Sequence, residues 1–353
     1  KVLSPEQIAA RLDDRFRLLT GGSRTALPRQ QTLRAMIDWS YSLLAEQEKI
    51  LFRRLAVFVG GWTLDAAEAV CADAGQDGIL PYDVLDLLTR LVDKSLIVIE
   101  EKEGEIRYHR LETIRQYSRE KFFETNEVQT VRDRHLDFFV QFAELVDKKL
   151  KSSDQLLWHN RMSAEQDNLR AALEWGLKSH PDSALRIAGA ANLFWTAGGF
   201  SAEGFRWTQQ ALEQVKKTPL AKGIASKGRL AARAKALCGL TRLYLSLGDN
   251  ASAKRAAEES IALYRQSQDP RGLAFALIVL AYPLEFLGER EQAEAALQES
   301  YSIGRAEGDT YLICRALNRL GHVIVDLYHD LDLAQRYVEE SLQLAQEAGL
   351  RSQ

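Results

Sequence analysis

Histidine and cysteine, the side chains that most often carry chemistry, are few in this chain and are spread along it. The six histidines form neither an H-E-x-x-H pair nor a Cys/His quartet with zinc-ligand spacing. The three cysteines include no C-x-x-C pair, and no serine stands in a nucleophile elbow. We therefore expect no metal site and no catalytic residue. The residues concerned are His109, His135, His159, His180, His322, His329, Cys71, Cys238 and Cys314.

The sequence also contains no motif that is typical of nucleotide phosphate binding. The chain contains no G-x-x-x-x-G-K-[ST] loop, and Gly21-Gly22-Ser23 lacks both the lysine and the strand that would precede it. Backbone amides and a lysine are needed to hold the β- and γ-phosphates of a nucleotide during hydrolysis. We expect that this chain by itself is not an enzyme.

Aromatic residues in the C-terminal half are candidates for lining a ligand groove. Trp195 and Trp207 flank a turn, and Tyr244 takes the place of Trp195 in a later copy of an internal repeat. Flat aromatic faces suit sugars, bases and other planar rings. Their helical spacing is more often that of core residues, so we favour core packing and keep the ligand groove as the alternative.

The elements that would position these residues are mainly helices, with one exception near residues 96–111. Leu96 to Ile99 and the alternating Ile106, Tyr108 and Leu111 flank a charged turn with Gly104, which predicts a β-hairpin. Three helical patterns come before it, and a helix follows it. Three helices and a two-stranded wing are the order of a winged helix-turn-helix. The predicted helices span residues 32–58, 63–74, 81–94 and 112–124.

An internal repeat of 40 to 41 residues follows. Leu247-Gly248-Asp249 recurs as Leu287-Gly288-Glu289, and Glu259-Ser260 recurs twice. Small residues recur where two helices of a hairpin would cross, because a larger side chain would hold the backbones apart. No hairpin buries its apolar face alone, so we expect the copies to stack into an αα superhelix with a concave surface. The small residues are Gly204, Ala253, Ala293 and Ala334.

Composition and charge exclude several classes of protein. With 46% hydrophobic and 27% charged residues the chain should fold, and a net charge of −3 provides no general attraction to nucleic acid or anionic lipid. The unpaired cysteines favour a reducing, cytoplasmic location, and no apolar run is long enough to span a membrane. Because the chain starts at Lys1 instead of Met, we expect a fragment of a longer protein, with further repeats after Gln353.

Several long stretches resemble the STAND-class signal-transduction ATPases, which include the large LuxR-like and AfsR-like transcriptional regulators. The stretches are RQQTLRAMIDWSYSLLAEQEKILFRRLAVFVGGWTLDAAEAVC, DVLDLLTRLVDKSLI, YHRLETIRQYSREK and AEQDNLRAALEWGL. The resemblance implies the end of a helical domain in residues 1–28, including a short helix over Pro5–Leu19, a winged-helix domain in 29–125 and a tetratricopeptide-like repeat arm in 126–353. It also implies a parent protein that binds ATP or ADP with magnesium through a nucleotide-binding domain upstream of this chain.

The same resemblance assigns one site residue. His109, in Tyr108-His109-Arg110-Leu111, takes the place of the family's histidine that contacts the β-phosphate of ADP, and Arg110 replaces the family's aspartate. An imidazole N–H can approach an anionic oxygen closely. The alternative is a wing histidine with only local hydrogen bonds, and any phosphate contact would exist in the parent only.

Three functions follow as hypotheses. In the first, the repeat arm binds a small-molecule inducer or a protein, and the winged helix relays that event to the upstream nucleotide-binding domain, with transcription as the output. In the second, the repeats are a passive scaffold for protein–protein interaction. In the third, the winged helix binds DNA, but its third helix sets Asp83, Asp86 and Asp93 against Arg90 and Lys94, whereas DNA-reading helices have a basic flank. We therefore expect no direct contact of this chain with nucleic acid.

Overall fold

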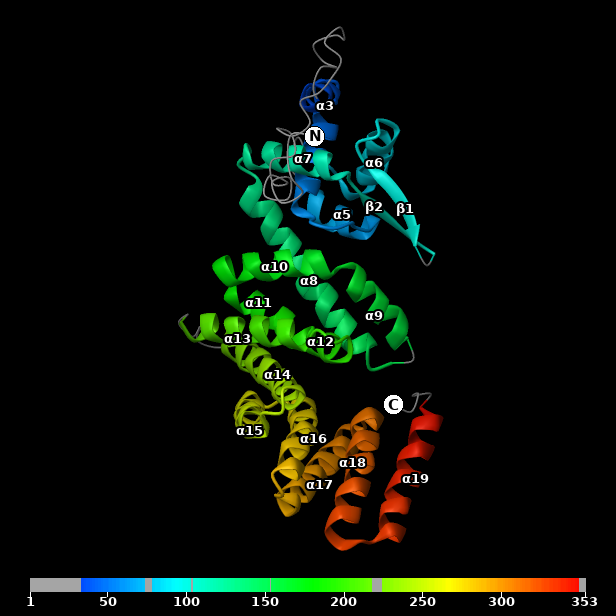
Figure 1. Ribbon diagram of the computed structural model, residues 1–353, viewed down its shortest axis with the longest axis vertical. Coiled ribbons are helices and arrows are strands. Elements are labelled where there is room, and N and C mark those ends of the chain that lie inside the picture. Colours follow the sequence, from blue (N-terminus) through cyan, green and yellow to red (C-terminus); the bar gives the residue numbers. More distant parts are fainter. Residues whose placement is uncertain (1–32, 74–77, 103, 153, 218–223, 349–353) are drawn as a thin grey trace, which may run out of the picture. The chain divides into compact units, whose positions relative to one another are not determined.

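The computed structural model describes residues 33–73, 78–102, 104–152, 154–217 and 224–348. The chain forms two compact units (Figure 1). The described part of the first contains residues 33–138 and 165–171, and that of the second contains 139–164 and 172–348. Helices α8 and α10 therefore each contribute residues to both units. The predicted helix Pro5–Leu19 and the lead-in over residues 1–28 lie outside the described residues.

The first unit contains the predicted winged helix. Helices α4, α5 and α6 come before a two-stranded antiparallel sheet in which Val98 pairs with His109 and Lys102 with Glu105. Its elements are α3 (Leu33–Ser42), α4 (Glu46–Arg54), the 3-10 turn η3 (Leu55–Val57), α5 (Leu64–Cys71), the 3-10 turn η4 (Pro81–Asp83), α6 (Val84–Asp93), β1 (Val98–Lys102), β2 (Glu105–His109), α7 (Glu112–Phe123) and the start of α8 (Val128–Lys149).

Local sequence explains where these helices begin. The Thr63 hydroxyl accepts a hydrogen bond from the Ala66 amide at 3.3 Å and caps α5, and Pro81 starts the turn that leads into α6. The continuous pattern over residues 32–58 is divided in the structure. The Glu48 carboxylate accepts a bond from the Ala45 amide at 2.8 Å, which starts a new helix after Ser42.

An aromatic core joins the wing to the helices. Trp62 exchanges two backbone hydrogen bonds of 2.9 Å with Tyr108, so a short bridge extends the hairpin. The Trp62 ring stacks on Phe58 at 5.6 Å and on Tyr108 at 6.5 Å between ring centroids. Burial of such large rings contributes several kcal/mol to folding, at about 1.5–3 kcal/mol for each side chain. The wing is therefore held by packing as well as by its strand pairing.

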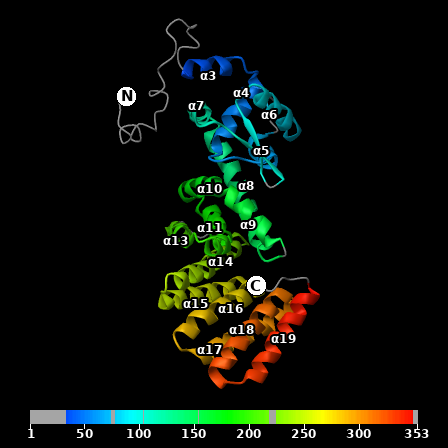
Figure 2. The same ribbon diagram turned by 45° about the vertical axis from the view of Figure 1, so that its right-hand side comes forward.

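The second unit is a series of helices, and from α11 to α19 each helix packs on the next one along the chain (Figures 1 and 2). They confirm the predicted arm of αα hairpins. Among the described residues, no helix has the length and apolar character needed to cross a membrane. The helices are α9 (Gln155–Ala164), α10 (Gln166–Ser179), α11 (Pro181–Ala190), α12 (Asn192–Ala197), α13 (Ser201–Lys217), α14 (Ile224–Ser246), α15 (Asn250–Ser267), α16 (Pro270–Phe286), α17 (Arg290–Glu307), α18 (Thr310–Tyr328) and α19 (Leu331–Glu347).

A buried serine explains one recurring feature of the repeats. The hydroxyls of Ser260 and Ser300 donate to the backbone carbonyls of Ala234 and Ala274, at 2.7 and 2.9 Å. Ser341 makes the equivalent bond to Cys314, at 3.0 Å. Each bond joins the second helix of a hairpin to the first. The recurring small residues Ala253, Ala293 and Ala334 are buried at the same crossings, as predicted.

The turn inside each hairpin needs a residue in the left-handed backbone region. Gly248 and Gly288 take φ values of 79° and 78°, which glycine adopts without steric cost. In the last hairpin His329 takes this place with a φ of 54°. A side chain in this region costs about 1 kcal/mol. The last repeat therefore has a histidine at the turn position where glycine is favoured for its backbone conformation.

Candidate ligand-binding cavity of the repeat arm

His109 lies at the end of β2, where it pairs with Val98, and its side chain is half-buried. The Nδ1 atom is buried and has no hydrogen-bond partner among the described residues. A local hydrogen bond therefore does not account for this nitrogen in the part of the chain that the structure describes. Its assignment as a phosphate contact in the parent stays a prediction.

Arg110, next to His109, has a packing role. Its guanidinium is buried and donates to the carbonyls of Leu55 at 2.7 Å and Phe58 at 3.3 Å, and to the Ser118 hydroxyl at 2.5 Å. It also lies 5.1 Å from the centre of the Trp62 ring. Burial lowers the pKa of Arg110 to about 9. Arg110 thus caps the free carbonyl groups at the C-terminal end of α4 and η3. The replacement of the family's aspartate by an arginine did not indicate this role.

The start of α10 is joined to the wing within the first unit. Glu165 forms a 2.6 Å ion pair with Arg107 of β2, and both side chains are buried. The Asn168 amide donates to the Gly61 carbonyl at 2.8 Å and accepts from the Val59 amide at 2.9 Å. These two residues belong to the AEQDNLRAALEWGL stretch, so part of that stretch has a structural role.

The three aromatic residues predicted to line a groove lie in the repeat arm, but they do not line either of the cavities described below. Trp195 is 1% exposed, and its ring packs against Gly204, where a Cβ would lie 2.7 Å from it. The Trp207 indole donates to Glu203 at 3.1 Å, and the half-buried Tyr244 meets Phe205 at 5.2 Å between ring centroids. Their role in ligand binding stays a prediction.

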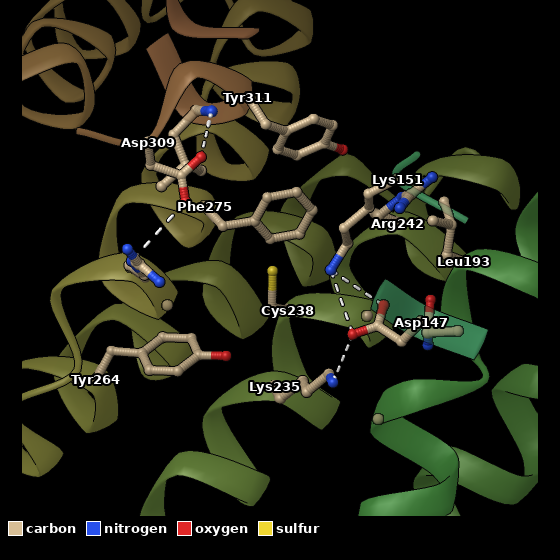
Figure 3. Close-up of a pocket in the computed structure, with 16 residues that line it drawn as sticks. Asp147, Lys151, Leu193, Lys235, Cys238, Arg242, Tyr264, Phe275, Asp309 and Tyr311 are labelled. Atoms are coloured by element: carbon tan, nitrogen blue, oxygen red, sulfur yellow. Dashed lines mark hydrogen bonds and ion pairs between the residues drawn. The ribbon is translucent and has the colours of Figure 1, made fainter. Parts of the chain in front are cut away.

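A cavity of about 250 Å³ lies elsewhere in the arm (Figure 3). Its wall combines residues of α8, α11, α12, α14, α15, α16 and α18, from a span of more than 160 positions in the sequence. Glycines lie where helices approach closely, and a Cβ at Gly239 would clash with Asn192. The residues that line it are Asp147, Lys151, Gly189, Asn192, Leu193, Lys235, Cys238, Gly239, Arg242, Tyr264, Arg271, Gly272, Phe275, Asp309, Tyr311 and Leu312.

One side of the cavity is a satisfied charge cluster. Figure 3 shows Lys151 and Lys235 converging on the Asp147 carboxylate, at 3.1 and 2.6 Å. Burial by itself would raise the pKa of Asp147, but the two ammonium groups outweigh it and hold that pKa below its usual range. Asp147 therefore stays ionised, and its single negative charge neutralises part of the positive charge of the two lysines.

Two other polar side chains of the wall have no partner in the described part of the chain. Arg242 of α14 makes no ion pair or hydrogen bond there, and burial together with the nearby Arg315 cation lowers its pKa. Asn192 at the start of α12 is 4% exposed, and neither its amide nitrogen nor its amide oxygen has a hydrogen-bond partner. Buried polar groups are nearly always hydrogen-bonded, so Asn192 marks a place for a ligand or ordered water, and the half-buried Arg242 lines the same cavity.

A second cavity of about 450 Å³ shares Lys151 and Tyr311 with the first. Arg319 lies over the Tyr282 ring at 4.0 Å and forms a double hydrogen bond with Glu285, at 2.7 and 2.8 Å. Together the two walls contain six basic side chains and two acidic ones. The basic ones are Lys151, Lys235, Arg242, Arg271, Arg315 and Arg319, and the acidic ones are Asp147 and Asp309.

The thiol of Cys238 in the cavity wall is not suited to covalent chemistry. Burial raises the pKa of Cys238 to about 12, so its thiol stays protonated at neutral pH and is a poor nucleophile. The three cysteines are free and buried. Within the described ranges, no group of three His, Cys, Asp or Glu residues is placed to hold a metal ion. The arrangement suits binding of a ligand.

Comparisons with known proteins agree with the helix and wing order of the first unit. The model of the family "Winged helix-turn-helix domain" matches residues 44–122. The model of the family "Anaphase-promoting complex subunit 5" matches residues 227–283 and 275–327, two overlapping stretches of the repeat arm. The winged helix expected from the sequence is therefore confirmed.

Similar curated proteins occur in mycobacteria. The chain is 39% identical over 316 residues to candidate HTH-type transcriptional regulators of Mycobacterium tuberculosis (strain ATCC 25618 / H37Rv) and Mycobacterium bovis (strain ATCC BAA-935 / AF2122/97). That match covers 89% of this chain and 35% of each relative, so the chain spans about a third of their length. An uncharacterized protein of Mycobacterium tuberculosis is 42% identical over 144 residues, which is 41% of this chain and 36% of that protein.

Two solved structures show weaker likeness. One is a signal-transduction ATPase with numerous domains and a tetratricopeptide repeat sensor from Pyrococcus horikoshii, with a TM-score of 0.40 and 17% identity over 98% of this chain and 57% of the other. The second has kinesin light chain TPR-like repeats from Podosopora anserina, with a TM-score of 0.43 and 16% identity over 61% of this chain and 98% of the other.

Proposed function

We propose that this chain is the sensor and relay region of a STAND-type signalling ATPase that controls transcription. Its similarity to candidate transcriptional regulators over 89% of its length supports a regulatory role. The observation that carries the proposal is the cavity in the repeat arm, whose wall contains Arg242 and Asn192 without partners in the described residues. Unpaired polar groups in a concave wall favour a receptor for a small-molecule inducer over a passive scaffold.

The winged helix is the relay in this proposal. The buried Arg107–Glu165 pair and the Asn168 bonds fix the start of α10 to the wing. The same helix continues into the repeat arm after Ala171. A continuous helix is a stiff element, so it can transmit a change in the arm to the wing. A ligand that shifts a switch from 1:99 to 99:1 must favour one state by about 5.5 kcal/mol.

The partner of the relay is the nucleotide-binding domain expected upstream in the parent. This chain would contribute one contact through His109, whose buried Nδ1 has no hydrogen-bond partner among the described residues. The phosphate loop and the magnesium ligands would belong to the upstream domain, which supplies the hydrolysis chemistry when ATP is bound. We propose accordingly that this chain by itself holds no cofactor and catalyses no reaction. We also propose that the protein acts in the cytoplasm.

Nucleotide retention in the full-length parent tests the relay. With His109→Ala, we expect less ADP to co-purify, as measured by native mass spectrometry, and a higher basal output of the parent. His322→Ala is the matched control, because His322 is exposed on α18. ADP occupancy equal to wild type in the His109 variant would show that this histidine has no such role.

DNA binding by the winged helix is the second candidate, and the family match to residues 44–122 favours it. The exposed side of α6 offers Arg90 and Lys94 beside Asp86 and Asp93, and Lys94 is 2.6 Å from the Glu48 carboxylate. This balance supplies little attraction for phosphates. Salt-dependent binding of the chain to duplex DNA at low ionic strength, lost in the double variant Arg90→Ala and Lys94→Ala, would favour this function over the relay.

A further inference from the structure

We infer that the cavity of the repeat arm binds a small anionic molecule, with its carboxylate or phosphate oxygens at Arg242 and another polar group at the Asn192 amide. This inference rests on the proposed sensor function and adds the chemical class of the inducer. Three features support it: the charge of the wall, the unpaired cation within that wall and the unpaired amide.

The charge of the wall differs from that of the whole chain. Six basic and two acidic side chains line the two adjoining cavities, while the whole chain has a net charge of −3. A concave, low-dielectric wall of one sign concentrates its field and attracts ligands of the opposite sign. An anion would gain more from this excess of basic side chains than a neutral or cationic ligand. The positive charge inside an acidic protein therefore favours an anion.

Arg242 is the cation with the greatest need of a partner. Asp147 balances Lys151 and Lys235, Glu285 balances Arg319, and Arg271 lies 3.9 Å from Asp309. No carboxylate among the described residues does the same for Arg242, which also feels the like charge of Arg315. A planar guanidinium can bind a carboxylate or phosphate through two parallel hydrogen bonds. An anion beside it would offset both the burial and the repulsion.

Asn192 gives the ligand a second, uncharged contact. Asn192 lines the cavity and is only 4% exposed. Its amide nitrogen and its amide oxygen both lack a hydrogen-bond partner among the described residues. An amide can donate to a ligand oxygen and accept from a hydroxyl or amine at the same time. Glycine at position 239 leaves room for the Asn192 side chain, because a Cβ atom on residue 239 would clash with that side chain.

The size of the cavity selects a small molecule over a folded partner. Its volume of about 250 Å³ is at the lower end of the range of roughly 300–1,000 Å³ for small-molecule pockets. Tyr311 and Phe275 provide apolar surface beside the charged groups. The site thus fits an acid of a few carbon atoms or a compact phosphate.

Calorimetric titration of the full chain tests the inference with three probes. Succinate and inorganic phosphate represent the two anionic classes, and succinamide is the neutral counterpart of succinate. We expect at least one anion to bind and succinamide to bind much more weakly. Whichever of the two anions binds more tightly identifies the class. Equal binding of succinate and succinamide, or no binding of either anion at millimolar concentration, would overturn the inference.

Variants then locate the site. Arg242→Met should weaken binding of the anion by about tenfold or more, equivalent to about 1.4 kcal/mol. Arg255→Met, which removes an equal charge from the exposed face of α15, should leave the affinity unchanged. Asn192→Leu keeps a similar volume without the two polar atoms and should also weaken binding. It serves as an independent test should the Arg242 variant not fold. Unchanged affinity in both cavity variants would contradict the assignment.

The failure of this inference can be told apart from that of the proposed function. An uncharged inducer that alters the output of the parent and binds equally to wild type and Arg242→Met would leave the sensor function standing and refute an anionic ligand. Anion binding that depends on Arg242 but changes neither nucleotide retention nor output of the parent would support the site and refute the sensor function.

Discussion

The two units both pair their buried charges, but the repeat arm also has a half-buried cation, Arg242, without a partner among the described residues. In the winged-helix unit, buried cations have anionic or carbonyl partners: Arg54 contacts Asp73 and Glu127, Arg107 contacts Glu165, and Arg110 binds backbone carbonyls. In the repeat arm, buried Arg229 pairs with Asp182, whereas the half-buried Arg242 has no ion-pair partner among the described residues. An unpaired charge that is partly withdrawn from water costs stability, and the ligand proposed above would offset that cost.

The largest effect expected from this comparison is in the winged-helix unit. Arg107→Met leaves the Glu165 carboxylate buried without its cation, and burial already raises the pKa of Glu165 despite that cation. We expect the free energy of unfolding to fall by about 3–5 kcal/mol, measured by urea denaturation. Combining it with Glu165→Leu should recover most of the loss, because no charge remains buried. A loss below about 1 kcal/mol for Arg107→Met would break the comparison.

A smaller effect comes from His135, which the first unit keeps uncharged. Burial lowers its pKa to about 3, from 6.5 in the unfolded chain. Between these values the unfolded state binds one proton more than the folded state, so stability falls as the pH falls through that window. From pH 7 to pH 5 we expect a loss of about 2 kcal/mol from this residue.

The measurement is the pH dependence of the free energy of unfolding for wild type and His135→Gln. The variant should lose the part of the slope that lies between pH 6.5 and pH 5. His322→Gln, at an exposed position, should keep the wild-type slope. An identical slope in wild type and His135→Gln would mean that the histidine titrates normally in the folded protein.

The smallest effect, of opposite sign, is expected in the repeat arm. Arg242→Met removes a cation that partial burial and the nearby Arg315 charge both destabilise. No carboxylate among the described residues compensates for these two effects. We expect the free energy of unfolding to stay unchanged or to rise by about 1 kcal/mol. Thermal denaturation without added anions measures this change. A loss of more than about 2 kcal/mol would show that Arg242 has a packing role like that of Arg107.

Much of the fold follows from periodic patterns in the sequence. Turn glycines at Gly248 and Gly288 and the buried serines at 40-residue spacing predict the hairpins, because each has one local geometric reason. The wing follows from alternating residues on both sides of Gly104. The division of the pattern over residues 32–58 was not predicted, because it depends on one carboxylate, Glu48, capping the next helix.

The cavity was beyond prediction because its wall comes from residues far apart in the sequence. Asp147, Asn192 and Arg242 meet only after seven helices have packed. One signal was present: Arg242 and Arg315 each interrupt an otherwise apolar helix face, in Leu240–Leu243 and Ile313–Leu317. The aromatic residues Trp195 and Trp207 drew attention by type, yet the structure buries both. A charged residue among apolar neighbours was the better guide.

The serine bonds have a mechanical consequence. Ser260, Ser300 and Ser341 each fasten the two helices of one hairpin at their crossing, where a slip by one turn would break a buried bond. Each hairpin should therefore behave as a stiff link, and bending should concentrate at the joints between links. A molecule seated across several links could alter the pitch of the whole array with little distortion of any single member.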